Sequence, residues 1–345
     1  MHVCQIPRQA VSVHRRQFKY LALVRECLLC LVLMALQLPN PARAEQHVPH
    51  SIDAVPDAIR SPQGRDQFAF QMGGAAPPDG FGARLPAGLS TKAVVRLVLP
   101  NAPAHLITLV GVRQLRGYPG EYAAIVCVAP NEREWQRTRE YYENQPQCGV
   151  FSSATAPFRI ALGVLQWSGR GVPRLLARLE WNSVEGGPLR ADWKDAGIEV
   201  PDDLTDYPST IPVRTSVPHE LHRFDLADYR ISQGARVFGL RWSFSVPYSG
   251  GGADWEGLTL FELKDGALRT VLTEPMYHFA MYGGDWNPDG TRQHPTVEES
   301  VILRIARGST DGYQNLELRR TEHKVQWRRT LRWSTRCDCY RHEKP

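Results

Sequence analysis

Short segments rich in β-branched and aromatic residues alternate with glycine and proline turns from residue 91 to residue 333. Such segments predict β-strands. We expect strands over residues 93–99, 105–112, 122–128, 158–167, 173–181, 236–245, 258–263, 268–272, 301–306, 313–320 and 325–333. Asp265–Gly266 and Asp311–Gly312 occupy two of the turns, and Asp-Gly is a strong hairpin signal. The pattern predicts a mainly β chain forming an antiparallel sandwich, barrel or partial propeller.

One short helix is predicted within this pattern, at residues 132–143. Asn131 is placed to cap it, and Glu134 completes a capping box. The chain following Asn131 also places Trp135, Thr138 and Tyr142 on one face of the helix, with charged residues elsewhere.

Two segments do not read as strands. Residues 45–90 include the run Gly-Gly-Ala-Ala-Pro-Pro-Asp-Gly-Phe-Gly, a composition that predicts a flexible, disordered lead-in. Residues 183–218 carry five prolines and an acidic cluster. We interpret them as a connection between an N-terminal β region at residues 91–182 and a C-terminal antiparallel β region at residues 219–345. The alternative is that the connection lies over a single sandwich.

The first 44 residues have the order of a secretory signal peptide. Basic residues precede an apolar run from Cys27 to Leu36, and Ala42-Arg43-Ala44 supplies small residues before Glu45. The apolar run is shorter than the roughly 20 residues that cross a bilayer. We therefore expect a periplasmic or secreted protein after cleavage near Ala44, with retention as an uncleaved anchor as the alternative.

The positive net charge of the chain comes mostly from the predicted signal peptide. The net charge is +5, but residues 1–44 hold six of the 41 Lys and Arg residues and one of the 36 acids. The remaining chain carries 35 of each and has no general electrostatic preference for nucleic acid, which export also disfavours. It contains no further apolar run of about 18 residues, so we expect no transmembrane segment in the mature chain.

Four of the seven cysteines lie after residue 44. An even number in an exported chain favours disulfides. We prefer the pair Cys127–Cys148, which would tie the predicted helix to the strands. For Cys337 and Cys339 we favour a structural bridge, either strained between the two or crossed with the other cysteines. Three pairings of four cysteines exist, and the Cys-x-Cys sequence is also compatible with a metal site or a labile redox bond.

The loop from Gly284 to Gln293 has oxygen-bearing side chains at alternate positions, followed by a glycine. This spacing suits a hard cation, and Asp285–Gly290 resembles the calcium loops of EF-hands and of FG-GAP and VCBS repeats. The resemblance implies a calcium site. Its candidate ligands are Asp285, Asn287, Asp289, Thr291 and Glu298. Unlike an EF-hand, this chain has Thr296 at the bidentate glutamate position, and the alternative is an Asx-type turn whose carboxylates cap backbone amides.

Carboxylates in the C-terminal region also suit a hydrolase that uses two of them as general acid and base. The candidates are Asp254, Glu256, Asp285, Asp289 and Glu298. The spacing selects no pair, so this hypothesis requires two of them to converge in one pocket, about 5–10 Å apart. The aromatic residues that we expect to line a ligand groove are Tyr248, Trp255, Tyr282 and Trp286.

The chain from Leu316 to Pro345 holds nine Lys and Arg residues against four acids. Trp327, Trp333 and Tyr340 are interleaved with them, a pattern that suits contact with phosphates or with a glycan polymer such as peptidoglycan. The alternative, which we favour here, is that the arginines lie on the solvated face of strands and protect a sheet edge.

Residues from about 223 to 333 contain Phe238-Gly239-Leu240, Tyr248-Ser249-Gly250, Pro275-Met276 and Gly284-Asp285-Trp286. On these residues the region resembles a group of uncharacterised exported proteins of Gram-negative bacteria. The resemblance implies export and a β fold. Our first hypothesis is a non-enzymatic binding module that contacts an envelope component or protein, with calcium as the one candidate cofactor. The alternative is a cell-envelope hydrolase acting on a glycan or peptide polymer.

Overall fold

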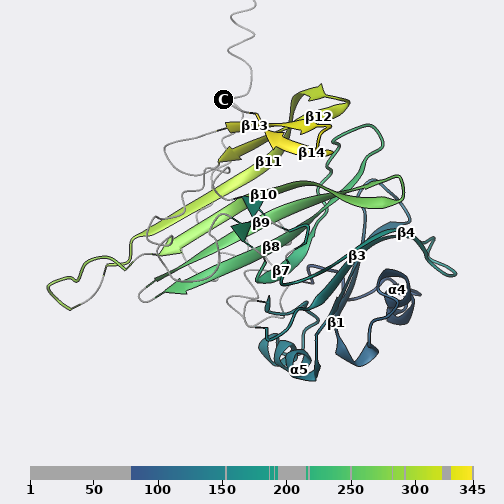
Figure 1. Cartoon of the computed structure of the whole chain (residues 1–345), viewed down its shortest axis with the longest axis horizontal. Coiled ribbons are helices and arrows are strands. Elements are labelled where there is room, and N and C mark those ends of the chain that lie inside the picture. Colours follow the sequence, from purple (N-terminus) through teal and green to yellow (C-terminus); the bar gives the residue numbers. More distant parts are fainter. Residues whose placement is uncertain are drawn as a thin grey trace, which may run out of the picture. The chain divides into compact units, whose positions relative to one another are not determined.

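The computed structural model describes residues 79–151, 154–185, 187–189, 191–192, 215–216, 218–248, 251–281, 283–290, 293–320 and 328–343. The predicted signal peptide and residues 45–78 of the predicted lead-in lie outside these ranges, as do Tyr282, Thr291 and Trp327. The described chain is mostly β, with two principal antiparallel sheets of four and eight strands (Figure 1). The predicted fold class is confirmed in its sandwich form.

The four-stranded sheet, here the small sheet, has the order β1-β2-β3-β4. Its strands are β1 (Ile107–Gln114), β2 (Glu121–Val128), β3 (Arg159–Gln166) and β4 (Arg174–Asn182). The two inner strands, β2 and β3, are almost continuously apolar, which is typical of strands covered on both faces. Helix α4 (Thr91–Val98) packs its Val94 and Val98 against one of these faces.

The strand that we expected over residues 93–99 is wrong, because this segment forms α4. The Ser90 side chain accepts a hydrogen bond from the Ala93 amide at 3.2 Å and caps the helix. Val94 and Val98, four residues apart, are both fully buried. Packing of this stripe on the small sheet outweighs the weak preference of valine for strands.

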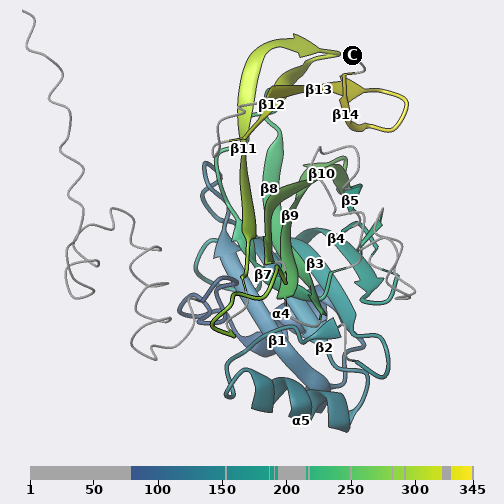
Figure 2. The same ribbon diagram turned by 90° about the vertical axis from the view of Figure 1, so that its left-hand side faces the viewer.

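The eight-stranded sheet, here the large sheet, follows the chain without a crossover and has the order β14-β13-β12-β11-β10-β9-β8-β7 (Figure 1). In the turned view of Figure 2, β12, β13 and β14 lie at the end of the sheet away from β7. Every pair in it is antiparallel, as the predicted meander requires. Its strands are β7 (Glu220–Asp225), β8 (Arg236–Tyr248), β9 (Gly251–Lys264), β10 (Ala267–Met281), β11 (Thr296–Thr310), β12 (Tyr313–Arg320), β13 (Arg328–Ser334) and β14 (Cys339–His342). We did not predict β7 or β14. A small pair, β5 (Ala191–Asp192) with β6 (Thr215–Ser216), lies in the proline-rich connection.

One hydrophobic cluster joins the two sheets. It contains Ile125 and Leu162 of the small sheet together with Phe238 and Trp242 of the large sheet. The prediction of a disordered lead-in is wrong for its described part, residues 79–90, because Phe81 is buried in the same cluster. Residues 91–182 and 219–345 therefore share a core.

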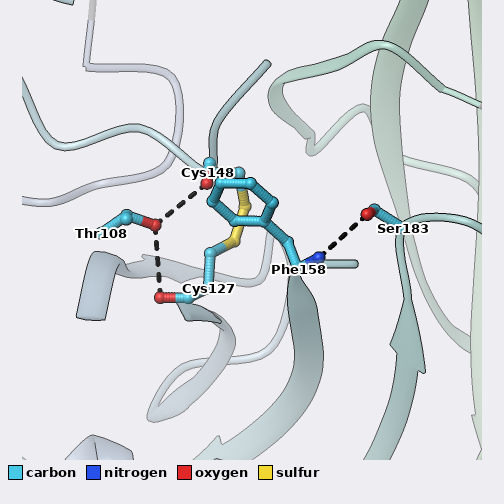
Figure 3. The surroundings of a disulfide bond; sticks show 5 residues. All are labelled: Thr108, Cys127, Cys148, Phe158 and Ser183. Carbon is cyan, nitrogen blue, oxygen red and sulfur yellow. Dashed lines mark hydrogen bonds between the residues drawn. A yellow bond between two sulfur atoms is a disulfide. The ribbon is translucent and has the colours of Figure 1, made fainter. Parts of the chain in front are cut away.

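The predicted helix is confirmed as α5 (Glu132–Tyr141), and the Asn131 side chain accepts a hydrogen bond from the Glu134 amide at 3.0 Å. The preferred disulfide Cys127–Cys148 forms, and Cys337 is paired with Cys339. In the Cys127–Cys148 disulfide the Cα atoms are 5.1 Å apart, and Thr108 Oγ1 donates a hydrogen bond to the Cys148 carbonyl at 3.0 Å (Figure 3). This bridge ties the chain that follows α5 to β2.

A second hydrophobic cluster covers part of the large sheet on the face that turns away from the small sheet. Leu258, Leu260 and Leu272 of β9 and β10 meet Leu331 and Trp333 of β13 in it. The cluster ends near Leu258. Beyond that residue the same face is polar, and it carries the candidate site.

Candidate functional site

Strand alternation separates two faces at the end of the large sheet where β8 meets β9 and β10 meets β11. Phe244 and Trp255 lie in the core shared with the small sheet and are 4% and 2% exposed. The residues beside Trp255, Asp254 and Glu256, lie on the opposite face. We call that face the open face. It comprises Ser243, Ser245, Asp254, Glu256, Tyr277, Phe279, Glu298 and Ser300.

The strand register arranges these side chains in two rows. The first row runs Ser243, Glu256, Tyr277, Ser300 across β8, β9, β10 and β11. The second row runs Ser245, Asp254, Phe279, Glu298 across the same strands. Side chains directly opposite on neighbouring antiparallel strands have Cβ atoms about 4.5–5.5 Å apart, so each row is a continuous strip of contacts.

Two aromatic rings form the centre of the open face. Tyr277 and Phe279 are both partly buried, and the Tyr277 hydroxyl donates a hydrogen bond to Glu298 Oε1 at 3.1 Å. Asp254 and Glu298 flank Phe279 on the two neighbouring strands. Two strand spacings separate the backbones of these acids by about 9–10 Å. The arrangement is an apolar ring with a carboxylate on each side.

The carboxylates of the open face differ in their surroundings. Asp254 is exposed, but desolvation by the surrounding chain raises the pKa of its carboxyl above the ordinary value. Glu256 instead accepts a hydrogen bond from Arg241 Nη1 at 2.8 Å, and Arg241 Nε donates another to Asp225 Oδ2, also at 2.8 Å. Burial acts to raise the pKa of Asp225, but the Arg241 guanidinium, together with hydrogen bonds from the Ala227 amide and Tyr229, outweighs it and the pKa falls. Arg241 therefore neutralises much of the charge at Glu256, and Asp254 and Glu298 are left as the acids beside Phe279.

A serine and a histidine meet at the margin of the open face. His222 Nε2 and Ser243 Oγ are 2.6 Å apart, and His222 is exposed. Desolvation by its neighbours lowers the pKa of His222, although Glu256 and Glu220 act in the opposite direction. The hydrogen bond fixes both side chains and extends the first row with an imidazole. Because serine and histidine in contact are also the first two groups of a nucleophilic dyad, Ser243 is a useful control in any test for hydrolysis.

The predicted calcium loop forms a hydrogen-bonded turn between β10 and β11. The Gln293 amide donates to the Asp285 carbonyl at 2.9 Å, and Gln293 Nε2 donates to Asn287 Oδ1 at 3.0 Å. Glu298 lies on β11, where it accepts from Tyr277. No cluster of three or more His, Cys, Asp or Glu side chains suited to a metal occurs in the part of the chain that the structure describes. The calcium site stays a prediction.

The four aromatic residues that we expected to line a groove do not lie together in the described structure. The prediction that Trp255 lines a groove is wrong, because its ring is buried between Phe244 and His278. The ring centroids are 4.4 Å apart for Trp255 and Phe244 and 5.2 Å apart for Trp255 and His278. Trp286 is 70% exposed in the loop between β10 and β11. The side chain of Tyr248 and all of Tyr282 lie outside the described parts.

Sequence reasoning missed Tyr277, Phe279, His222 and Ser243. The segment Pro275-Met276-Tyr277-His278-Phe279-Ala280-Met281 is apolar or aromatic at almost every position, so its sequence does not show which residues face solvent. A register shift between Pro275 and Tyr277 further displaces the alternation. The acids Asp254, Glu256 and Glu298 were recognisable as candidates, whereas the aromatic rings between them depend on the register.

A cavity of about 580 Å³ lies at the opposite end of β8. It is formed by the β1–β2 turn, the β7–β8 loop and the β11–β12 turn, with Arg116, Tyr118 and Arg230 among its lining residues. The Tyr118 hydroxyl donates to the Ala235 carbonyl at 2.6 Å and joins two of these loops. The side chains that line it are of mixed character and point to no particular ligand.

Neither the helices, the disulfides nor a comparison with known proteins identifies a function for this chain. None of its helices, within the described ranges, has the length and apolar character needed to cross a membrane. The two disulfides are compatible with an exported protein. No protein family, no curated protein and no solved structure matches this chain.

Proposed function

We propose that this protein is an exported binding module that holds a glycan polymer of the cell envelope on its open face. The observation that carries the proposal is the ring of Phe279 between the carboxylates of Asp254 and Glu298. A pyranose ring has an apolar C–H face and a rim of hydroxyl groups. Phe279 offers a surface for the C–H face, and the two carboxylates accept hydrogen bonds from the rim.

The extent of the rows supports a polymer as the ligand. Each row crosses four strands, which is about 14 Å at the usual strand spacing and longer than one sugar ring. Serine hydroxyls lie at both ends of the first row, at Ser243 and Ser300. Tyr277 and Phe279, on alternate positions of β10, provide neighbouring stacking surfaces.

The charge of the open face narrows the ligand class. Among the described residues, the neighbours of Asp254 and Glu298 in their row are Ser245 and Phe279, and neither is basic. Two acids beside the stacking ring disfavour a strongly anionic polymer. A neutral glycan, or one that carries amino groups, fits this face better.

A hydrolase acting on the same polymer is the second candidate. The raised pKa of Asp254 is the property that a general acid needs, and Glu298 lies across Phe279 as a candidate base. Inverting glycosidases hold their carboxyl groups about 6.5–9.5 Å apart. The backbone spacing of about 9–10 Å for these two strands is compatible with that range.

Co-sedimentation with insoluble polymers tests the binding proposal. Purified peptidoglycan sacculi and chitin are the two probes, and we expect the wild-type chain to sediment with at least one of them. Phe279→Ala should weaken binding about tenfold, equivalent to about 1.4 kcal/mol. Tyr141→Ala is the matched control, because Tyr141 is an aromatic residue on α5 with 62% exposure. Absence of wild-type binding to both polymers, or equal weakening in the two variants, would contradict the proposal.

Release of soluble reducing ends from the same polymers tests the hydrolase candidate. Hydrolysis that disappears in Asp254→Asn but persists in Ser243→Ala would establish an acid–base pair on the open face. Hydrolysis that disappears in Ser243→Ala would instead assign it to the Ser243–His222 contact. Binding without release of reducing ends leaves the binding module as the function.

A further inference from the structure

The outer face of the last strands of the large sheet is dominated by arginine. Leu316, Leu331 and Tyr340 of β12, β13 and β14 point into the second hydrophobic cluster. Strand alternation places their neighbours on the opposite, outer side. We call this side the arginine face. It comprises Arg304, Arg319, Arg328, Arg332 and Arg341, with Glu317 and Glu343 as its acids.

The strand register places like charges directly opposite one another. Arg319 of β12 is the register partner of Arg328 of β13. Arg332 of β13 is the partner of Arg341 of β14. Like charges in such positions destabilise a sheet.

Two acids on this face only partly offset the arginines. Glu343 forms an ion pair with Arg332 at 2.7 Å. Glu317 is the register partner of Arg304 on one side and of Thr330 on the other. Among the described residues of this face, five guanidinium groups and two carboxylates give an excess of three positive charges. Arg328 and Arg341 are both exposed.

Protection of a sheet edge, the interpretation that we favoured from the sequence, explains only a small part of this pattern. The edge strand on this side is β14, and of the five arginines it carries only Arg341. Arg319, Arg328 and Arg332 lie on β12 and β13, which have paired strands on both sides. Interior strands have no free edge to protect.

The aromatic residues that the structure describes in these strands, Tyr313, Trp333 and Tyr340, lie on the other side. Trp333 and Tyr340 are 5% and 4% exposed in the second hydrophobic cluster, and Trp333 stacks on Tyr313 at 3.6 Å between centroids. They therefore support the strands from within and are not available to stack on a sugar or a base. What this side offers to a partner is an extended array of guanidinium groups.

We propose that the arginine face docks the protein onto a membrane surface rich in anionic phospholipids. Guanidinium groups bind phosphate through paired N–H donors. The arginines are spread over four neighbouring strands rather than along one, so the cations form a two-dimensional array. Such an array matches phosphates spread over a membrane surface better than phosphates in a single line. The proposal is independent of the glycan site, which lies on other residues.

Vesicle co-sedimentation of the full chain tests the proposal. The probes are vesicles of phosphatidylcholine alone and vesicles with equal parts of phosphatidylcholine and phosphatidylglycerol. Each basic residue near an anionic surface contributes about 1 kcal/mol, so three excess charges predict partitioning on the order of a hundredfold stronger on the anionic vesicles. The preference should weaken as salt is raised. Equal partitioning on both vesicles would overturn the proposal.

The discriminating variant is Arg328→Glu with Arg341→Glu. In this variant each new glutamate stands opposite an arginine, Arg319 or Arg332, so we expect its Tm to rise above that of the wild type. Because it also removes two cations from the arginine face, we expect it to lose the preference for anionic vesicles. Arg174→Glu with Arg178→Glu is the matched control, because it changes two exposed arginines of β4 by the same charge. All chains carry the same residues 1–44, so any effect of that segment is common to them.

An equal loss of binding in the control would show that total charge is responsible and would overturn the proposal. Unchanged binding in Arg328→Glu with Arg341→Glu would also overturn it. If that variant does not fold, Arg328→Gln with Arg341→Gln removes the same cations without adding acids. Loss of the preference in this second variant, with the control unaffected, supports the proposal, and retention contradicts it.

Discussion

The small sheet and the large sheet differ in how their strands are covered: β3 is buried on both faces, whereas the end of β9 is buried on one face only. In β3 of the small sheet, every residue from Ile160 to Leu165 is buried, because α4 covers one face and the large sheet covers the other. In β9 of the large sheet, Ala253 and Trp255 are buried while Asp254 is exposed and Glu256 is partly exposed. The small sheet therefore serves as a support, and only the large sheet has a face on which polar chemistry meets solvent.

This difference explains where substitutions are tolerated. A residue on either face of β3 is part of a core, so a change of volume or polarity there affects stability. At the end of β9 only alternate residues are part of a core and must keep their volume and polarity. The residues between them face solvent and are available for binding. The predictions below test this contrast, beginning with the largest expected effect.

Adjacent residues of β9 should behave very differently. We expect Trp255→Ala to lower the free energy of unfolding by about 3–5 kcal/mol, because it empties a space between Phe244 and His278. Asp254→Ala, one residue earlier, should change it by less than about 0.5 kcal/mol. Chemical denaturation of both variants measures the contrast. Similar losses in the two would mean that the open face is part of a core.

The disulfide that anchors the small sheet should have the next largest effect. Cys127–Cys148 closes a loop with a sequence separation of 21, and constraint of such a loop in the unfolded chain contributes about 3 kcal/mol. We expect Cys127→Ala with Cys148→Ala to lose about that amount in chemical denaturation. Cys337→Ser with Cys339→Ser, where the separation is 2, is the control and should lose far less. Similar losses would contradict the loop argument.

A buried histidine on the core side of the large sheet should make the protein acid-sensitive. His278 is 1% exposed, its ring nitrogens lack hydrogen-bond partners among the described residues, and burial lowers its pKa from 6.5 to about 4. The unfolded chain therefore binds a proton that the folded chain excludes. The contribution of neutral His278 to the free energy of unfolding is fully present above pH 6.5. It is lost as the pH is lowered toward 4, and the loss is about 2 kcal/mol at pH 5.

Denaturation midpoints at pH 7.5 and pH 5 measure this dependence. His278→Phe keeps an aromatic ring beside Trp255 and should remove about 2 kcal/mol of the difference between the two pH values. His105→Gln, at an exposed position, is the control and should leave the difference unchanged. A wild-type difference that survives in His278→Phe would assign the acid sensitivity to other groups.

Much of the fold was predictable because its signals are local. The strands at residues 105–112, 122–128 and 313–320 and the helix after Asn131 were recognisable from composition, turns and a cap. The failure at residues 93–99 has a physical cause, since Val94 and Val98 suit either a strand or a helical stripe and only the small sheet decides between them. The strand β7 was missed because Glu-Leu-His-Arg-Phe-Asp contains no β-branched residue.

The candidate site was predictable only in part. Chemistry alone identified Asp254, Glu256 and Glu298 as acids worth considering, but their grouping depends on which residues of β9, β10 and β11 stand opposite each other. The same register decides that Trp255 faces the core and Phe279 faces solvent. A register is set by pairing between strands, so it cannot be worked out from any one segment.

The unbroken order of the large sheet has a consequence for how the chain folds. Each of its strands hydrogen-bonds only to the strands that precede and follow it, so its ladders form between residues that are close in sequence. Contacts of this kind close short loops and speed folding. Docking onto the small sheet joins Phe81 to Phe224, which are far apart in the chain, and requires a long closure. We therefore expect hairpins of the meander to form early and the union of the two sheets to limit the rate of folding.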